Sequence, residues 1–224
     1  MPPETMVITP SGAEHYTLSE FEFEPVPERR YVVFDLEATG ADGETDSVTQ
    51  FGAVAVYDDG PSNNERFTSL VRPWKPIPPE IERLTGITNT AVAGAEAFPA
   101  VWGRFQEFCG DAVLVTQCGY EFDFPVLDRE CARSGIAPST NIRLDTKALY
   151  ALLHPDLEVN PSTNFLSERY GIDRKLFRPH NALGDAMLIA RIFCRVRDDM
   201  REQGKTRLAT EKPVRIHRFI LPPL

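Results

Sequence analysis

The chain has 224 residues and a formal net charge of −9, and its length suits one domain with a sizeable core. The charge argues against a protein that coats nucleic acid, because such proteins are usually basic, but it leaves room for an enzyme that grips only a strand end. There is no run of 18 apolar residues and no secretory signal at the N-terminus, so we expect neither a membrane span nor secretion. The cysteines are scattered and form no C-x-x-C pair, which predicts a reducing, cytoplasmic location.

The first part of the chain passes from an acidic, proline-rich segment to apolar runs. Residues 1–28 contain six glutamates and five prolines but no lysine or arginine, which predicts an extension outside the core. Apolar runs at 31–34, 48–57 and 66–71 predict three strands, and the polar cluster at 58–64 predicts the turn between the last two. Because the connections are short, we expect an antiparallel meander.

Apolar residues at helical spacing dominate the rest of the chain. Short strands are expected at 112–116 and 142–144, among six predicted helices at 78–84, 97–108, 124–134, 146–153, 161–170 and 182–203. A meander followed by alternating strands and helices predicts an α/β fold, in which helices cover one mixed sheet. The last residues, 211–224, are too few to form a domain of their own.

Two carboxylates stand at the end of the first apolar strand. Alternation along a strand places Asp35 and Glu37 on the same face. Neighbouring carboxylates repel each other unless a cation neutralises them, and Mg²⁺ prefers such oxygen ligands. The pair predicts a metal site, although a solvated strand end carries the same pattern.

Three more residues are candidates for the same chemistry. Asp123 precedes the predicted helix at 124–134, where it can serve either as a metal ligand or as the helix N-cap. Asp185 lies at the start of the longest helix, where it can bind a metal or simply interact with the positive helix end. His180, five residues earlier, is suited to take a proton from water near neutral pH, but it can also be an ordinary surface histidine.

In this order and spacing, the motifs resemble those of the DEDDh 3′→5′ exonucleases, over about residues 30–197. The matching segments are Asp35-Leu36-Glu37-Ala38-Thr39-Gly40, Phe122-Asp123, His180 with Asp185, the stretch from Pro78 to Thr88, and Leu144-Asp145-Thr146. The chain departs from the family pattern at Ala38, where threonine is usual, and at Cys118 and Gly119, where histidine and asparagine are common. These departures leave the carboxylates in place but alter their surroundings.

The resemblance implies a ribonuclease H-like fold, a five-stranded mixed sheet with helices on both faces. We therefore divide the chain into an N-terminal extension (1–28), an exonuclease domain (29–204) and a C-terminal tail (205–224). The implied reaction is hydrolysis from the 3′ end, releasing nucleoside monophosphates by a two-metal-ion mechanism with Mg²⁺ or Mn²⁺. Its implied metal ligands are Asp35, Glu37, Asp123 and Asp185, its general base is His180, and its substrate contacts are Leu36, Ala38, Thr39, Ile87, Phe124 and His180.

The expected partner is the 3′ end of a single strand, either DNA or RNA, together with a polymerase or another replication or repair protein. The alternative function is a non-catalytic nucleic-acid-binding or polymerase accessory subunit that keeps the exonuclease fold. A basic segment before His180 adds one further hypothesis. Arg169, Arg174, Lys175 and Arg178 can contact phosphates upstream of the cut, or they can simply be the solvated face of a loop.

Overall fold

The structure is a computed structural model that describes residues 7–11, 14–25, 28–42, 44–157 and 159–218. Its centre is a five-stranded sheet in the order β6-β5-β4-β7-β8. The strands are β4 (Tyr31–Ala38), β5 (Val48–Tyr57), β6 (Gly60–Leu70), β7 (Val113–Thr116) and β8 (Arg143–Asp145). The helices are α1 (Pro79–Thr85), α2 (Asn89–Val92), α3 (Phe98–Cys109), α4 (Asp123–Ser134), α5 (Thr146–Leu153), α6 (Thr163–Arg169), the 3₁₀ turn η1 (Arg174–Leu176) and α7 (Ala182–Glu202).

The central strand β4 joins the antiparallel and parallel halves of the sheet. On one side, β4 pairs antiparallel with β5, and β5 pairs antiparallel with β6. On the other side, β4 pairs parallel with β7, and β7 pairs parallel with β8. Residues 31–34 are fully buried, as expected for an apolar run in the middle of a sheet. The predicted α/β fold with a five-stranded mixed sheet is confirmed.

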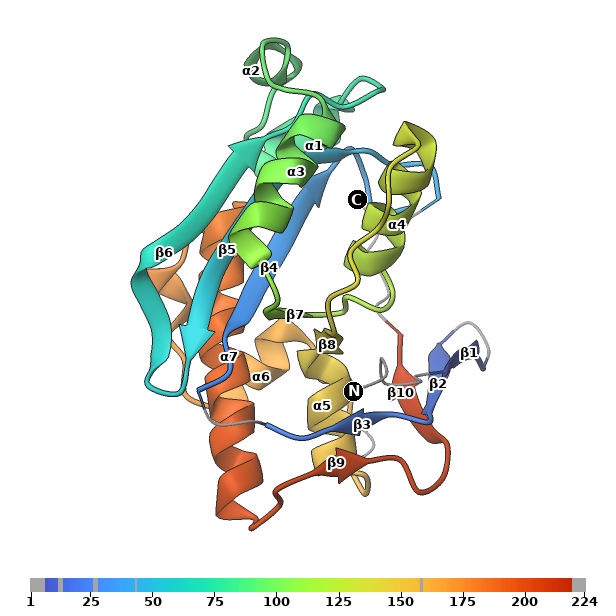
Figure 1. Cartoon of the computed structure of the whole chain (residues 1–224), viewed down its shortest axis with the longest axis vertical. Coiled ribbons are helices and arrows are strands. Elements are labelled where there is room, and N and C mark those ends of the chain that lie inside the picture. The colour runs from blue at the N-terminus through green and yellow to red at the C-terminus, as the bar shows by residue number, and fades with distance from the viewer. Residues whose placement is uncertain (1–6, 12–13, 26–27, 43, 158, 219–224) are drawn as a thin grey trace.

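Alternation along β4 directs successive side chains to helices on opposite faces of the sheet. Phe34 packs against Phe105 of α3 and Phe124 of α4, whereas Tyr31 packs against Phe193 of α7. Figure 1 shows α3 in front of the sheet and α7 behind it. Asp35 and Glu37 have the same parity as Tyr31, so they belong to the face covered by α7.

Strand β6 begins earlier than the sequence predicts. The expected turn at 58–64 is confined to Asp58 and Asp59, because Gly60 already pairs with Tyr57 and Pro61 with Val56. The prediction of a turn through residue 64 was therefore wrong. The polar residues that suggested a turn lie in an edge strand, where solvent can reach them.

The first and last described segments of the chain both contribute to the core. Strands β1 (Val7–Pro10), β2 (His15–Ser19) and β10 (Val214–His217) form a second sheet in the order β1-β2-β10, and β3 (Glu22–Phe23) pairs with β9 (Leu208–Ala209). The inward residues of β2 and β3 join the main apolar cluster, as do Leu208 and Ile216. For the described residues, the expectation that 1–28 lie outside the core was wrong, because pairing with the tail gives this segment a buried face.

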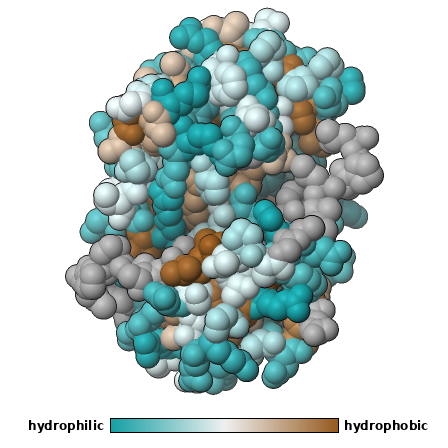
Figure 2. Space-filling model, turned by 90° about the vertical axis from the view of Figure 1, so that its right-hand side faces the viewer, coloured by the Kyte–Doolittle hydropathy of each residue, from teal (hydrophilic) through white to brown (hydrophobic). Residues whose placement is uncertain are grey.

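Among the described residues, we find no helix with both the length and the apolar character to cross a bilayer. The side of the molecule drawn in Figure 2 is largely hydrophilic, with only small apolar areas.

Candidate active site

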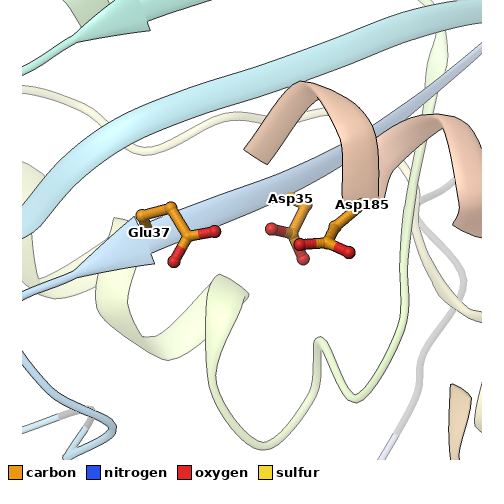
Figure 3. Close-up of side chains that lie close together, drawn as sticks. All are labelled: Asp35, Glu37 and Asp185. Atoms are coloured by element: carbon orange, nitrogen blue, oxygen red, sulfur yellow. The ribbon is translucent and has the colours of Figure 1, made fainter. Parts of the chain in front are cut away.

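Three carboxylates from two elements meet on the α7 face of the sheet. Asp35 and Glu37 of β4 and Asp185 from the first turn of α7 each offer an oxygen, and these oxygens all lie within 4.8 Å of one another. Figure 3 shows the carboxylates of Asp35 and Asp185 facing each other, with that of Glu37 directed toward them. Residues 150 positions apart in the sequence thus form one cluster.

The approach of α7 to β4 depends on a glycine in the neighbouring strand. Gly52 is the cross-strand partner of Asp35, and a Cβ atom at this position would lie 2.0 Å from the carbonyl carbon of Ala182. Only glycine lets the first turn of α7 pack directly on the sheet. Gln50, the partner of Glu37, accepts a hydrogen bond from the backbone N–H of Ala182 at 3.1 Å. Together these contacts place Asp185 beside Asp35.

Asp123 approaches the cluster from the other side, as the first residue of α4. It is buried and accepts a hydrogen bond from the Thr116 hydroxyl at 3.0 Å. It does not belong to the three-residue group, but its charge raises the pKa values of Asp35 and Glu37. The alternative role as a helix cap was wrong, because the N-cap is Phe122, which makes no side-chain capping bond.

The electrostatics of the cluster favour a bound cation. Burial is the main cause that raises the pKa of Glu37 to about 8 and that of Asp123 to about 7. Burial, followed by repulsion from the other carboxylates, also raises the pKa of Asp35 well above its ordinary value. Buried carboxylates that repel one another must either keep protons or bind positive charge. A donor set made only of carboxylate oxygens fits hard divalent ions such as Mg²⁺ or Mn²⁺.

Sequence reasoning missed the residue that supports the turn before Asp123. The buried carboxylate of Asp145 caps α5 by accepting from Lys147 N at 2.8 Å, and it also accepts from the backbone N–H groups of Cys118 at 3.2 Å and Tyr120 at 3.3 Å. Cys118 has a φ of 60°, which is unusual outside glycine. The only signal in the sequence was the Asp-Thr pair before a helix, which gave no indication of this turn.

His180 lies at the rim of the cluster. It is exposed, has a left-handed backbone with a φ of 52°, and directly precedes Asn181, the N-cap of α7. Its charge lowers the pKa of Asp185, which places the imidazole within electrostatic reach of that carboxylate. It is not part of the three-carboxylate group, so its part in catalysis stays a prediction.

The other expected substrate contacts are largely buried. Leu36, Ala38 and Ile87 each expose little surface. The Thr39 hydroxyl donates to Asp46 at 2.8 Å, and the Phe124 ring packs against Phe34. The side chains of Thr39 and Phe124 therefore have structural partners, and contacts of all five residues with a substrate stay predictions.

The basic segment before His180 is exposed in the structure. Arg174 and Lys175 belong to η1, and the charge of Arg174 lowers the pKa of Asp185. A hollow of about 630 Å³ is lined by the neighbouring residues Asp173, Leu176 and Phe177 and by residues of α7, but by none of the four basic residues and none of the four carboxylates. The candidate site is thus defined by its acidic cluster and not by this hollow.

Comparison with known proteins agrees with the geometry. The model of the exonuclease family RNase_T matches residues 32–193. The chain belongs to this exonuclease family. A curated relative, the PolC-type DNA polymerase III of Staphylococcus haemolyticus, is 32% identical over 179 residues, which is 80% of this chain but 12% of the relative. The exonuclease domain thus corresponds to a small part of that polymerase.

Solved structures share the fold of this exonuclease domain. The nuclease domain of 3′hExo, a DEDDh family member bound to rAMP, has a TM-score of 0.68 at 22% identity, covering 83% of this chain and 98% of that one. E. coli exonuclease I, in complex with a dT13 oligonucleotide, has a TM-score of 0.64 at 18% identity, covering 79% and 43%. The resemblance to DEDDh exonucleases is confirmed, and membership of an exonuclease family supports a nuclease function and the use of divalent metal ions.

Proposed function

We propose that this exonuclease hydrolyses phosphodiester bonds from the 3′ end of a single strand and releases nucleoside monophosphates. The observation that carries this proposal is the convergence of Asp35, Glu37 and Asp185, with Asp123 close enough to affect their ionisation. A cluster of this kind is unfavourable in a purely structural role, because its buried carboxylates repel one another unless positive charge is bound.

The four carboxylates are the proposed ligands of two Mg²⁺ or Mn²⁺ ions. When bound, such ions activate water and stabilise the charge that develops on the leaving 3′ oxygen. The protein's own part is to hold its carboxylates in position. Gly52 and Gln50 fix Asp185, Thr116 fixes Asp123, and the rigid strand β4 fixes Asp35 and Glu37.

His180 is the proposed general base. Its imidazole takes the proton from the attacking water, a role for which histidine is suited near neutral pH. An exposed turn next to Asp185 suits this role, because the ring is free to move over the scissile phosphate. The terminal nucleotide is held by the backbone and side chains of Leu36, Ala38 and Thr39 and by Ile87 and Phe124.

The neighbours support either nucleic acid as the substrate. E. coli exonuclease I was solved with a DNA oligonucleotide and 3′hExo with a ribonucleotide. The PolC-type relatives support a partnership with a polymerase or another replication or repair protein. The four free cysteines fit the proposed cytoplasmic location.

The decisive experiment compares DNA and RNA oligonucleotides labelled at one end, with Mg²⁺, with Mn²⁺ and with EDTA. We expect mononucleotide release that stops on chelation, slows with a 3′-phosphate and does not occur on circular strands. Asp35→Asn should remove activity without unfolding the protein. Asp156→Asn, on an exposed turn, is the control and should keep its activity. Full activity of Asp35→Asn would contradict the metal site, and cutting of circles would contradict the exonuclease polarity.

A further inference from the structure

An exposed tryptophan lies near two cationic side chains. Trp74, in the loop between β6 and α1, keeps 47% of its surface exposed. The guanidinium carbon of Arg133 is 4.5 Å from its ring centroid, and the Lys75 ammonium is 5.7 Å away. Exposed tryptophan is unusual on a protein surface and often marks a contact site.

The loop that carries this ring is fastened to the body of the domain. Trp74 N donates to the Ser47 hydroxyl at 3.2 Å, and that hydroxyl donates to Glu130 of α4 at 2.7 Å. Lys75 Nζ contacts Asp46 Oδ1 at 2.7 Å and the carbonyl of Thr45 at 2.9 Å. The backbone that carries the ring is therefore anchored before any ligand arrives, which lowers the entropic cost of binding.

Around the ring, the acidic side chains that pair with the cations are buried, whereas the cationic side chains are partly exposed. Glu130 exposes 3% of its side chain and Asp46 8%, whereas Arg133 exposes 46% and Lys75 28%. Arg129 adds another cation, although its partner Glu44 is itself exposed. Apart from Glu44, these residues would therefore present to a ligand the aromatic face of Trp74 and the positive charges of the lysine and the two arginines.

The position of the ring relates it to the candidate active site. Asp46, which holds Lys75, also accepts a hydrogen bond from Thr39, two residues beyond Glu37. Arg133 lies ten residues after Asp123 on α4, which is about 15 Å along the helix. Figure 1 shows α4 rising alongside the end of the sheet. A stacked strand advances about 3.4 Å per nucleotide, so this span corresponds to roughly four or five nucleotides.

We propose that Trp74, with Lys75 and Arg133, stacks a base of the single strand upstream of the 3′ end. The proposal rests on the exonuclease function above and extends its substrate site. An aromatic face accepts any base, and flanking cations attract the phosphates, which is the usual composition of sequence-tolerant single-strand sites. A hollow of about 250 Å³ beside the ring, lined by Arg72 and Asn89 among others, leaves room for a neighbouring nucleotide.

The fluorescence of Trp74 offers a direct test. The chain has two tryptophans, and Trp102 is only 5% exposed, so a ligand-dependent change should come from Trp74. Single-stranded oligonucleotides of 2 to about 12 nucleotides are titrated into the inactive Asp35→Asn protein. We expect quenching that sets in near five nucleotides. Long strands that bind, as measured by anisotropy, without quenching Trp74 would overturn the proposal.

The kinetic test compares substrate lengths in the active enzyme. Trp74→Leu should raise the ratio of KM for a dodecamer to KM for a dinucleotide about tenfold, while Trp74→Phe should keep most of the wild-type ratio because it retains a ring. Leu157→Ala changes an equally exposed apolar residue on another turn and serves as the control. An unchanged ratio in Trp74→Leu would refute the stacking site while leaving the nuclease function intact, whereas a wild-type protein that degrades no strand would refute the proposed function itself.

Discussion

Replacing Glu37 by glutamine should stabilise the metal-free protein at alkaline pH. Burial, with repulsion from Asp185 and Asp123, raises the pKa of Glu37 from 4.5 to about 8. Below pH 4.5 the carboxyl is protonated in both the folded and the unfolded chain, so it does not affect stability. As the pH rises toward 8, the unfolded chain loses this proton and the folded chain keeps it, so the free energy of unfolding falls.

The size of the effect follows from the same pKa. Each tenfold change in proton affinity corresponds to about 1.4 kcal/mol, so the difference between 4.5 and about 8 sets an upper limit of about 5 kcal/mol. Four carboxylates share the repulsion, and a proton on one relieves the others, so we expect roughly 2 kcal/mol. For a chain of this size, that gain raises Tm by about 4 to 8 °C.

The assay is thermal or urea unfolding of Glu37→Gln and wild type in EDTA, from pH 4.5 to pH 8.5. The difference between the two proteins should be small at the acid end and largest at the alkaline end. Added Mg²⁺ should stabilise the wild type more than the variant and so narrow the gap. Glu107→Gln, on the exposed face of α3, is the matched control and should show no such trend. A variant no more stable than wild type at pH 8.5 in EDTA would refute the reasoning.

Three further predictions concern other parts of the site. Gly52→Ala should push the first turn of α7 off the sheet, which displaces Asp185 and weakens Mg²⁺ binding. The free energy of unfolding should fall by about 1 to 3 kcal/mol. Calorimetric Mg²⁺ titration checks the prediction, and a wild-type Mg²⁺ affinity would contradict it. His180→Ala should lower kcat by ~10² to 10⁴ with near-normal Mg²⁺ affinity; wild-type kcat would exclude the base role. Changing Arg174 and Lys175 together to alanine should raise KM and flatten its dependence on salt, and a KM unchanged across salt concentrations would remove this segment from the strand path.

The sequence predicted the central sheet because its signals are local. The buried run at 31–34 and the apolar runs of β5 and β7 identify strands without knowledge of their partners. The terminal strands have no such signal, because β2 acquires a buried face only by pairing with β10, about 200 residues away. The early start of β6 was missed for a related reason, since an edge strand tolerates polar residues that also favour turns.

The candidate site was predictable to a similar degree. Alternation alone put Asp35 and Glu37 on one face, and the family resemblance supplied Asp123 and Asp185. The residues that position these carboxylates were not found from the sequence. The role of Gly52 depends on the packing of α7 against it, and the role of Asp145 depends on its hydrogen bonds to the turn before Asp123. Such support depends on contacts between distant segments, which a single sequence does not reveal.

The pairing of β2 with β10 joins two segments about 200 residues apart, with His15 directly opposite His217. The buried side chains of both strands also belong to the main apolar cluster. The terminal strands therefore act as a clasp, which ties two distant segments of the chain to each other and to the core of the domain.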